Sequence, residues 1–306
     1  MRKNLHASFI FATALAAVAL AGNAQAQSSP ARTSAPSSPA QGSSAAASCS
    51  LAAAPGVAEQ QLTSGGRPRT YRLFVPPRYD GRTPLPLVLD LHGSGGTSAG
   101  QASNSRFEAL AAREGVLVAT LQAESSRWNV PVSDGRPDDV AYVSDVIDHV
   151  AARVCTDAAR VYATGFSGGA RMSSLLACRL SDRIAAIAPM AGLRWPDGCG
   201  ARSVPVLTLH GLADPQNTYD GHAEGRGAEW VESVPDALAA WARHNGCDAN
   251  VVLEDPPGPL STMRYEGCDG GAEVRLIRID GLGHAWVREQ VDATAVMWEF
   301  FRKHTL

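Results

Sequence analysis

The sequence predicts an α/β fold in which helices cover both faces of a mostly parallel central sheet. Short apolar runs bounded by glycine and proline alternate with stretches of helical periodicity, as expected for strands linked by helices. The runs are apolar on both faces, which is typical of buried parallel strands. The chain has 306 residues, of which 45% are hydrophobic and 19% charged, so it can bury one sizeable core.

The elements follow from these patterns in chain order. An antiparallel pair, 59–63 and 69–75 around Ser64-Gly65-Gly66, is predicted to open the sheet at one edge. Six runs rich in leucine or β-branched residues are predicted to be buried strands: 85–91, 116–121, 160–166, 184–190, 204–209 and 274–279. Five segments with apolar residues at three- and four-residue spacing are predicted to be helices: 106–113, 138–154, 170–180, 236–244 and 291–304.

The first 54 residues are expected to lie outside the folded domain. Arg2 and Lys3 precede an apolar run, 9–21, and Ala24-Gln25-Ala26 follows it, which is the pattern of a signal peptide over 1–26. The run is shorter than the ~20 residues that cross a bilayer, so we expect no membrane span after cleavage. Residues 27–54, rich in Ser, Ala, Pro and Gln, are predicted to form a disordered linker, and 55–306 a single domain.

Export to a periplasm or to the medium would place the six cysteines in an oxidising compartment, where disulfides form. The preferred pairs are the local ones, Cys247 with Cys268 and Cys178 with Cys199, which leaves Cys49 with Cys155. Sequence alone permits all of the roughly 15 connectivities that six cysteines allow. We therefore treat this pairing as a hypothesis.

Charge and motifs exclude some classes of partner. The net charge is -3 and the isoelectric point is near 6.2, so no basic surface for nucleic acid is expected. The glycine-rich stretch 92–97 lacks the spacing of a phosphate-binding loop, which argues against nucleotide binding. No metal or organic cofactor is implied, and the sequence carries no prediction of oligomeric state.

A candidate nucleophile, Ser167, lies in Gly165-Phe166-Ser167-Gly168-Gly169. This G-x-S-x-G motif joins a predicted strand to a predicted helix, which is the setting of the nucleophile elbow in the α/β-hydrolase fold. A tight turn without catalytic function is the competing interpretation. The strand-turn-helix context favours a catalytic serine.

A catalytic serine needs a base and an orienting acid, which follow it in the chain in this fold. His284 lies in a glycine-containing loop after the last predicted strand, from which its ring could reach Ser167. Asp214 lies in the loop after the strand 204–209 and is the preferred acid. Asp220, six residues later, is the alternative.

Two backbone N–H groups are expected to stabilise the oxyanion of a tetrahedral intermediate. The fold takes one from the residue after the nucleophile, here Gly168, and one from the loop after the strand 85–91. In that loop Ser94 is the preferred donor and Gly95 the alternative.

Four tryptophans fall in loops at the end of the predicted sheet where such folds bind ligands: Trp128, Trp195, Trp230 and Trp286. Trp128 and Trp286 are predicted to contact substrate. The competing interpretation is that these side chains are buried for structural reasons.

Several motifs together resemble one family of secreted esterases, the polyhydroxybutyrate depolymerase and feruloyl esterase family. They are 91–96 (LHGSGG), 138–140 (DDV), 160–169 (RVYATGFSGG), His210-Gly211 with Asp214, and 283–286 (GHAW). The resemblance extends from Arg69 to the C-terminus and implies a catalytic domain with the same three residues, Ser167, Asp214 and His284. Many relatives carry a larger residue at the position of Gly168, and the chain has no polymer-binding extension after its final helix. Soluble oligomers or aryl esters are therefore the expected substrates, rather than insoluble polyester.

The sequence thus predicts a secreted serine carboxylic-ester hydrolase that works through an acyl-enzyme on feruloyl-type aryl esters, short acyl esters or soluble hydroxyalkanoate oligomers. Three alternatives stay open. The chain could be a serine peptidase or an acyltransferase on the same fold, or a secreted protein that binds a polysaccharide or polyester without catalysis.

Overall fold

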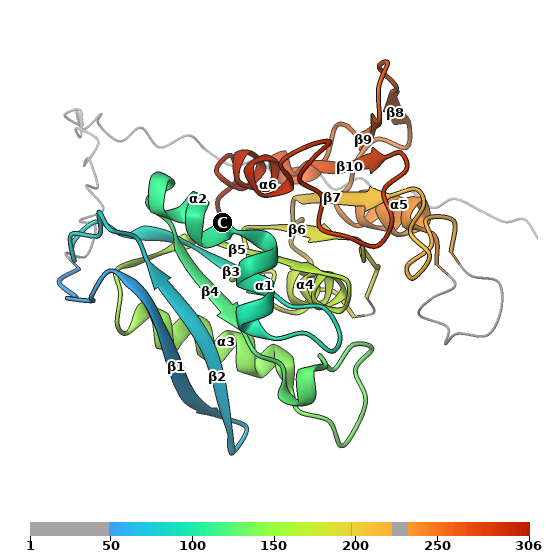
Figure 1. The fold of residues 1–306 in the computed structure, drawn as a ribbon. Coiled ribbons are helices and arrows are strands. Elements are labelled where there is room, and N and C mark those ends of the chain that lie inside the picture. Colours follow the sequence, from blue (N-terminus) through green and yellow to red (C-terminus); the bar gives the residue numbers. More distant parts are fainter. Residues whose placement is uncertain (1–48, 197, 222–231) are drawn as a thin grey trace, which may run out of the picture. The chain divides into compact units, whose positions relative to one another are not determined.

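The computed structural model describes residues 49–196, 198–221 and 232–306, which form one sheet with helices on both sides (Figure 1). The predicted signal peptide, 1–26, and residues 27–48 of the predicted linker lie outside the described residues. In the described part of the chain, no helix is long and apolar enough to span a membrane.

The sheet of the described residues has ten strands in the order β1-β2-β4-β3-β5-β6-β7-β10-β9-β8. Their bounds are β1 Gly56–Ser64, β2 Arg67–Val75, β3 Leu85–Leu91, β4 Leu117–Leu121, β5 Thr156–Phe166, β6 Ala186–Met190, β7 Val206–Gly211, β8 Val251–Glu254, β9 Leu260–Tyr265 and β10 Val274–Ile279. The six strands in the middle of this order pair in parallel: β4, β3, β5, β6, β7 and β10. The strands at the two ends, β1 and β2 at one and β9 and β8 at the other, pair antiparallel.

The described residues also contain six α-helices and two short 3₁₀ turns. Their bounds are α1 Ser98–Ser105, α2 Phe107–Glu114, η1 Glu124–Ser126, α3 Asp139–Ala151, α4 Gly168–Arg179, α5 Val234–His244, η3 Asp269–Gly271 and α6 Ala293–Phe301. The predicted fold class is confirmed: the six predicted buried strands are the six parallel ones, and the predicted opening pair is β1 with β2.

Apart from the short 3₁₀ turns, one helix and two strands were not predicted: α1, β8 and β9. Helix α1 and strand β9 lack the apolar pattern on which the prediction depended, and the apolar run of β8, in VVLE, is short. Helix α1 has the sequence SAGQASNS and buries polar side chains, among them Gln101 and Ser105. Strand β8 exposes Val251 and Leu253, and β9 is only partly buried. These elements exist because tertiary contacts satisfy their backbone, which local periodicity does not report.

Two apolar layers flank the sheet, and alternate side chains of each strand supply them. Leu87 and Leu89 of β3 belong to the layer that α3, α4 and α5 cover, whereas Val88 belongs to the layer that α2 and α6 cover. Burial on both faces explains why these strands are apolar without alternation. The loops at the ends of the strands therefore extend from a sheet that is packed on both faces.

The carboxyl ends of four parallel strands meet at one edge of the sheet. Leu91 of β3 pairs with Gly165 of β5, and Gly211 of β7 pairs with Ile279 of β10. The loops that follow these strands therefore leave the sheet on the same side. They carry Ser94, Ser167, Asp214 and His284.

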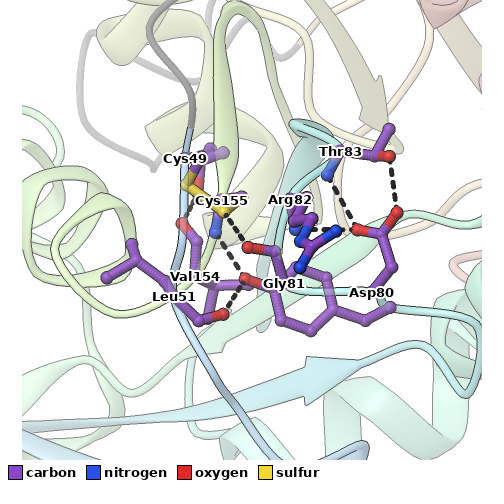
Figure 2. The surroundings of a disulfide bond; sticks show 10 residues. Cys49, Leu51, Asp80, Gly81, Arg82, Thr83, Val154 and Cys155 are labelled. Atoms are coloured by element: carbon purple, nitrogen blue, oxygen red, sulfur yellow. Dashed lines mark hydrogen bonds between the residues drawn. A yellow bond between two sulfur atoms is a disulfide. The ribbon is translucent and has the colours of Figure 1, made fainter.

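The described cysteines form three disulfides: Cys49–Cys155, Cys178–Cys199 and Cys247–Cys268. These are the pairs preferred from the sequence. Figure 2 shows the first, beside which Leu51 N donates a hydrogen bond of 3.0 Å to Gly81 O and Tyr79 Oη one of 2.6 Å to Leu51 O. Residues 49–51, at the end of the predicted linker, are thus attached to the folded domain.

Candidate active site

Ser167 lies at a sharp turn between β5 and α4. Its φ of 56° and ψ of -112° are unusual for a residue with a side chain, and they project the hydroxyl out of the turn. Two backbone hydrogen bonds hold this conformation: Ser167 N donates to Met190 O at 3.0 Å, and Arg171 N donates to Ser167 O at 3.1 Å. This is the strand-turn-helix geometry predicted for the nucleophile elbow.

The glycines around the turn permit a close approach between α4 and β3. A Cβ added to Gly165 would lie 2.6 Å from Leu91 O, and one added to Gly169 would overlap the same oxygen. Larger residues at either position would therefore push the helix away from the strand. The two glycines of the motif set the position of Ser167 relative to the loop that follows β3.

Asp214 and His284 are hydrogen-bonded although they are distant in the chain. His284 Nδ1 lies 2.7 Å from Asp214 Oδ2, and both side chains are buried, with the carboxylate fully so. The other carboxylate oxygen, Oδ1, accepts from the backbone N–H groups of Gln216 at 2.8 Å and Asn217 at 2.9 Å. These contacts fix the orientation of the carboxylate toward the imidazole.

The same hydrogen bonds keep the Asp214 carboxylate ionised. Burial raises the pKa of Asp214, but the hydrogen bonds from His284 and from the backbone of Asn217 and Gln216 outweigh it and leave the pKa below its ordinary value. An ionised Asp214 can only accept, so Nδ1 of His284 carries a proton and donates. Nε2 of the ring is then free to act as a base.

The loop of His284 lies next to the elbow. The ring of His284 lies 4.6 Å, centroid to centroid, from the ring of Phe166, the residue before Ser167. Ala213 N donates to Leu282 O at 3.0 Å, which joins the acid loop to the histidine loop. Within the described residues no hydrogen bond joins the Ser167 hydroxyl to His284, and such contacts often tighten only when substrate binds.

The alternative acid, Asp220, is exposed, whereas Asp214 is buried beside the imidazole. A second histidine, His210, helps to hold the acid loop: its Nε2 donates to Asn217 O at 2.7 Å. Burial lowers the pKa of His210 to about 4, so this ring is neutral near pH 7. No local sequence signal distinguishes such a positioning residue from an ordinary buried histidine.

The glycine-rich loop, residues 92–97, lies against the start of α4. A Cβ on Gly168 would lie 3.1 Å from Ser94 N, so the backbone N–H groups of these two residues are close neighbours. Gly95 N, the alternative donor, is already used in a 2.8 Å hydrogen bond to Ser126 O. Gly168 N, in the first turn of α4, has no intrahelical acceptor.

His92 holds the glycine-rich loop in place. Ala123 N donates to His92 Nε2 at 3.0 Å, which assigns the ring proton to Nδ1, and Nδ1 donates to Gly93 O at 2.7 Å. Burial lowers the pKa of His92 and favours this neutral form. Trp128 Nε1 donates to His92 O at 2.8 Å and completes the support of the loop.

The two tryptophans predicted to contact substrate are buried. Trp128 is 4% exposed and Trp286 is 6% exposed, and each indole N–H has an acceptor in the protein, Thr294 Oγ1 in the case of Trp286. Their burial corresponds to the competing structural interpretation. Trp195 is only partly buried, and Trp230 lies outside the described residues.

A cavity of about 540 Å³ lies along α4, beginning one helical turn after Ser167. Its walls combine apolar groups, Val130, Leu175 and Trp195, with the basic side chains of Arg171 and Arg194. A mainly apolar wall with a few polar groups is typical of pockets that bind small molecules. Across 49–196, 198–221 and 232–306, no group of three or more His, Cys, Asp or Glu side chains is placed to hold a metal ion.

The chain is similar to known esterases. The family model described as Esterase PHB depolymerase matches residues 69–234, more than half of the chain. Feruloyl esterase B of Piromyces equi is 32% identical over 224 residues, which are 69% of this chain and 41% of that protein. Feruloyl esterase C of Emericella nidulans is 27% identical over 268 residues, 82% of this chain and 91% of that protein.

Solved structures agree on the fold. An acetyl xylan esterase from Aspergillus awamori has a TM-score of 0.57 at 16% identity, covering 80% of this chain and 99% of its own. An S-formylglutathione hydrolase from Agrobacterium tumefaciens has a TM-score of 0.56 at 14% identity, covering 83% and 98%. The fold is thus that of the α/β-hydrolases, and the chain, a carboxylic ester hydrolase, belongs to the Esterase PHB depolymerase family.

Proposed function

We propose that the protein is a serine esterase that forms an acyl-enzyme on Ser167. The observation that carries this proposal is the 2.7 Å hydrogen bond between Asp214 and His284 in the loop next to the serine turn. His284 Nε2 takes the proton from Ser167 Oγ as this oxygen attacks the ester carbonyl, and Asp214 stabilises the imidazolium. The imidazolium then protonates the departing alkoxide, and the alcohol leaves.

Deacylation repeats these roles with water as the nucleophile. His284 takes a proton from the water as its oxygen attacks the acyl carbonyl, and returns that proton to Ser167 Oγ when the acid departs. In both tetrahedral intermediates the backbone N–H groups of Gly168 and Ser94 stabilise the oxyanion. Two observations support this assignment. The backbone N–H groups of Gly168 and Ser94 lie close together, and the N–H of Gly95 already donates to Ser126 O.

Replacing the nucleophile tests the serine mechanism. Ser167→Ala should lower kcat on p-nitrophenyl acetate by about 10⁴-fold or more, because the covalent step is lost while the fold is kept. Circular dichroism and a thermal melt provide the control for folding. Undiminished turnover by the folded variant would exclude Ser167 as the nucleophile.

For the substrate we propose feruloyl-type aryl esters, short acyl esters or soluble hydroxyalkanoate oligomers. The names of the relatives and the partly apolar cavity along α4 support this range. A panel of methyl ferulate, p-nitrophenyl esters, hydroxybutyrate oligomers and acetylated xylan, compared by kcat/KM, decides among them. Equal, slow rates on all four would contradict an ester of this range as the natural substrate.

We further propose that residues 1–26 direct export of the protein and are absent from its mature form. The three disulfides support an oxidising destination, since such bonds are rare in the cytosol. N-terminal sequencing of the mature protein from the culture medium or periplasm should find Gln27 as the first residue. Recovery of the intact chain with free thiols from the cytosol would contradict export.

A further inference from the structure

The side chain of Ser94 points at the start of α4. A Cβ built on Gly168 would lie 2.5 Å from Ser94 Oγ, closer than to Ser94 N at 3.1 Å or Ser94 Cβ at 3.5 Å. The hydroxyl is therefore the group nearest to Gly168 on this side. Ser94 is exposed, and among the described residues its hydroxyl has no hydrogen-bond partner, so its proton is available to a ligand.

We propose that the Ser94 hydroxyl donates a third hydrogen bond to the oxyanion, beside the backbone N–H groups of Gly168 and Ser94 itself. This rests on the proposed serine mechanism. The hydroxyl keeps its proton throughout: the bond that forms joins Ser167 Oγ to the carbonyl carbon, and the proton of Ser167 goes to His284. The hydrogen bond from Ser94 strengthens as negative charge develops on the carbonyl oxygen, which is where a donor lowers the barrier.

This proposal also explains the glycine at position 168. The residue belongs to α4, and its φ is not positive, so the backbone itself does not require glycine. Alanine would favour the helix, because glycine is the less stable of the two in a helix. The cost of alanine here is steric: its methyl carbon would lie 2.5 Å from Ser94 Oγ, too close for the hydroxyl to keep its position beside the oxyanion.

Ser94→Ala separates the hydroxyl from the backbone donor, since the variant keeps the N–H. We expect kcat on p-nitrophenyl acetate to fall by about 10- to 100-fold, with KM changed by less than about threefold, because the hydroxyl acts in the transition state. Ser94→Thr keeps a hydroxyl and should retain most of kcat. Ser103→Ala, which removes another exposed and unpartnered hydroxyl in α1, is the matched control and should match wild type.

Gly168→Ala supplies a test of the contact itself. In the wild-type background it should lower kcat by an amount similar to Ser94→Ala. In the Ser94→Ala background its further effect should be smaller, since the 2.5 Å contact with the hydroxyl is gone and the nearest remaining atoms lie at 3.1 and 3.5 Å. A boronic acid that mimics the tetrahedral intermediate should lose affinity for Ser94→Ala in proportion to the loss of kcat/KM, which a merely structural role would not produce.

The outcomes are distinguishable. A Ser94→Ala variant with kcat within twofold of wild type, or a Ser94→Thr variant as slow as Ser94→Ala, would overturn the third donor while leaving the serine mechanism intact. Full activity of Ser167→Ala, measured in the same assay, would overturn the mechanism and the third donor together.

Discussion

At the scale of single residues, hydrogen bonds hold the key side chains of the site in one orientation each. Asp214 uses Oδ1 for two backbone donors and Oδ2 for His284, so the carboxylate cannot rotate without losing three contacts. His210 and His92 are neutral supports of the two neighbouring loops, each with its proton assigned by the contacts it makes. These buried hydrogen bonds therefore orient the side chains of the site as well as stabilising the fold.

Asp214→Asn should lower kcat by about 10³- to 10⁴-fold. The amide nitrogen of asparagine can face Nδ1 of His284 and favour the tautomer whose proton is on Nε2, so that the ring can no longer act as a base. Asp220→Asn, a change to an exposed carboxylate, is the control and should leave kcat unchanged. If the Asp220 variant were the slower one, the assignment of the acid would be wrong.

The pH dependence of the rate should show one acidic limb. Because its hydrogen bonds hold the pKa of Asp214 below the ordinary value, this carboxylate stays ionised as the pH falls and adds no second ionisation to the acidic limb. We expect kcat/KM to fall tenfold per pH unit below this limb. A fall of a hundredfold per unit would show that two groups titrate together and contradict the prediction.

At the scale of elements, a buried polar network joins β3, α1 and α6. Gln101 Nε2 donates to Asp90 Oδ1 at 2.7 Å and Ser105 Oγ to Asp90 Oδ2 at 2.5 Å, while Thr294 Oγ1 donates to Ser105 O at 2.5 Å. Trp286, in the histidine loop, donates to Thr294 Oγ1 at 3.2 Å. The helix without apolar periodicity is thus held by hydrogen bonds that continue to the loop of the candidate base.

Asp90 should make stability depend on pH. Burial raises its pKa from 3.8 to about 7, against the lowering effect of Ser105 and Gln101. Between these values the folded protein holds a proton that the unfolded chain has released, so this contribution to the free energy of unfolding is full below about pH 4 and is lost as the pH rises to about 7. Asp90→Asn, which mimics the neutral acid, should flatten that fall.

Urea unfolding of wild type and Asp90→Asn at several values between pH 4 and 8 measures this effect. The other titrating groups are common to both proteins, so the difference between the two curves isolates Asp90. Parallel curves would show that Asp90 is ionised in the folded protein across the range.

At the scale of the whole domain, a disulfide attaches the segment around Cys49 to the sheet. The disulfide Cys49–Cys155 closes a loop of sequence separation 106, whereas Cys178–Cys199 and Cys247–Cys268 each close one of 21. It joins residues 49–51 to the residue that precedes β5. The same segment also makes two hydrogen bonds to the loop between β2 and β3. The larger loop restricts the unfolded chain more strongly than the smaller ones.

Replacing both Cys49 and Cys155 with serine should lower the free energy of unfolding by about 5 kcal/mol, against about 3 kcal/mol for the Cys178 and Cys199 pair. Urea unfolding without reductant measures the two losses and their order. A larger loss from the smaller loop would mean that the native contacts of residues 178–199 outweigh the chain-entropy effect.

Much of the architecture can be inferred from the sequence, because its causes are local. Buried parallel strands are apolar on both faces, and the turn around Ser167 needs small neighbours, so the six parallel strands and the candidate nucleophile are visible as patterns of adjacent residues. The cysteine pairs also agree with the simple preference for local partners.

Other features depend on contacts between segments far apart in the chain, which no local pattern encodes. Only the folded protein distinguishes Asp214 from Asp220 by burial, and Ser94 from Gly95 by the acceptor that Gly95 N already has. Folding likewise buries Trp128 and builds α1 from polar residues around Asp90. In each case the deciding quantity is access to solvent or to a distant hydrogen-bond partner, and tertiary packing alone sets both.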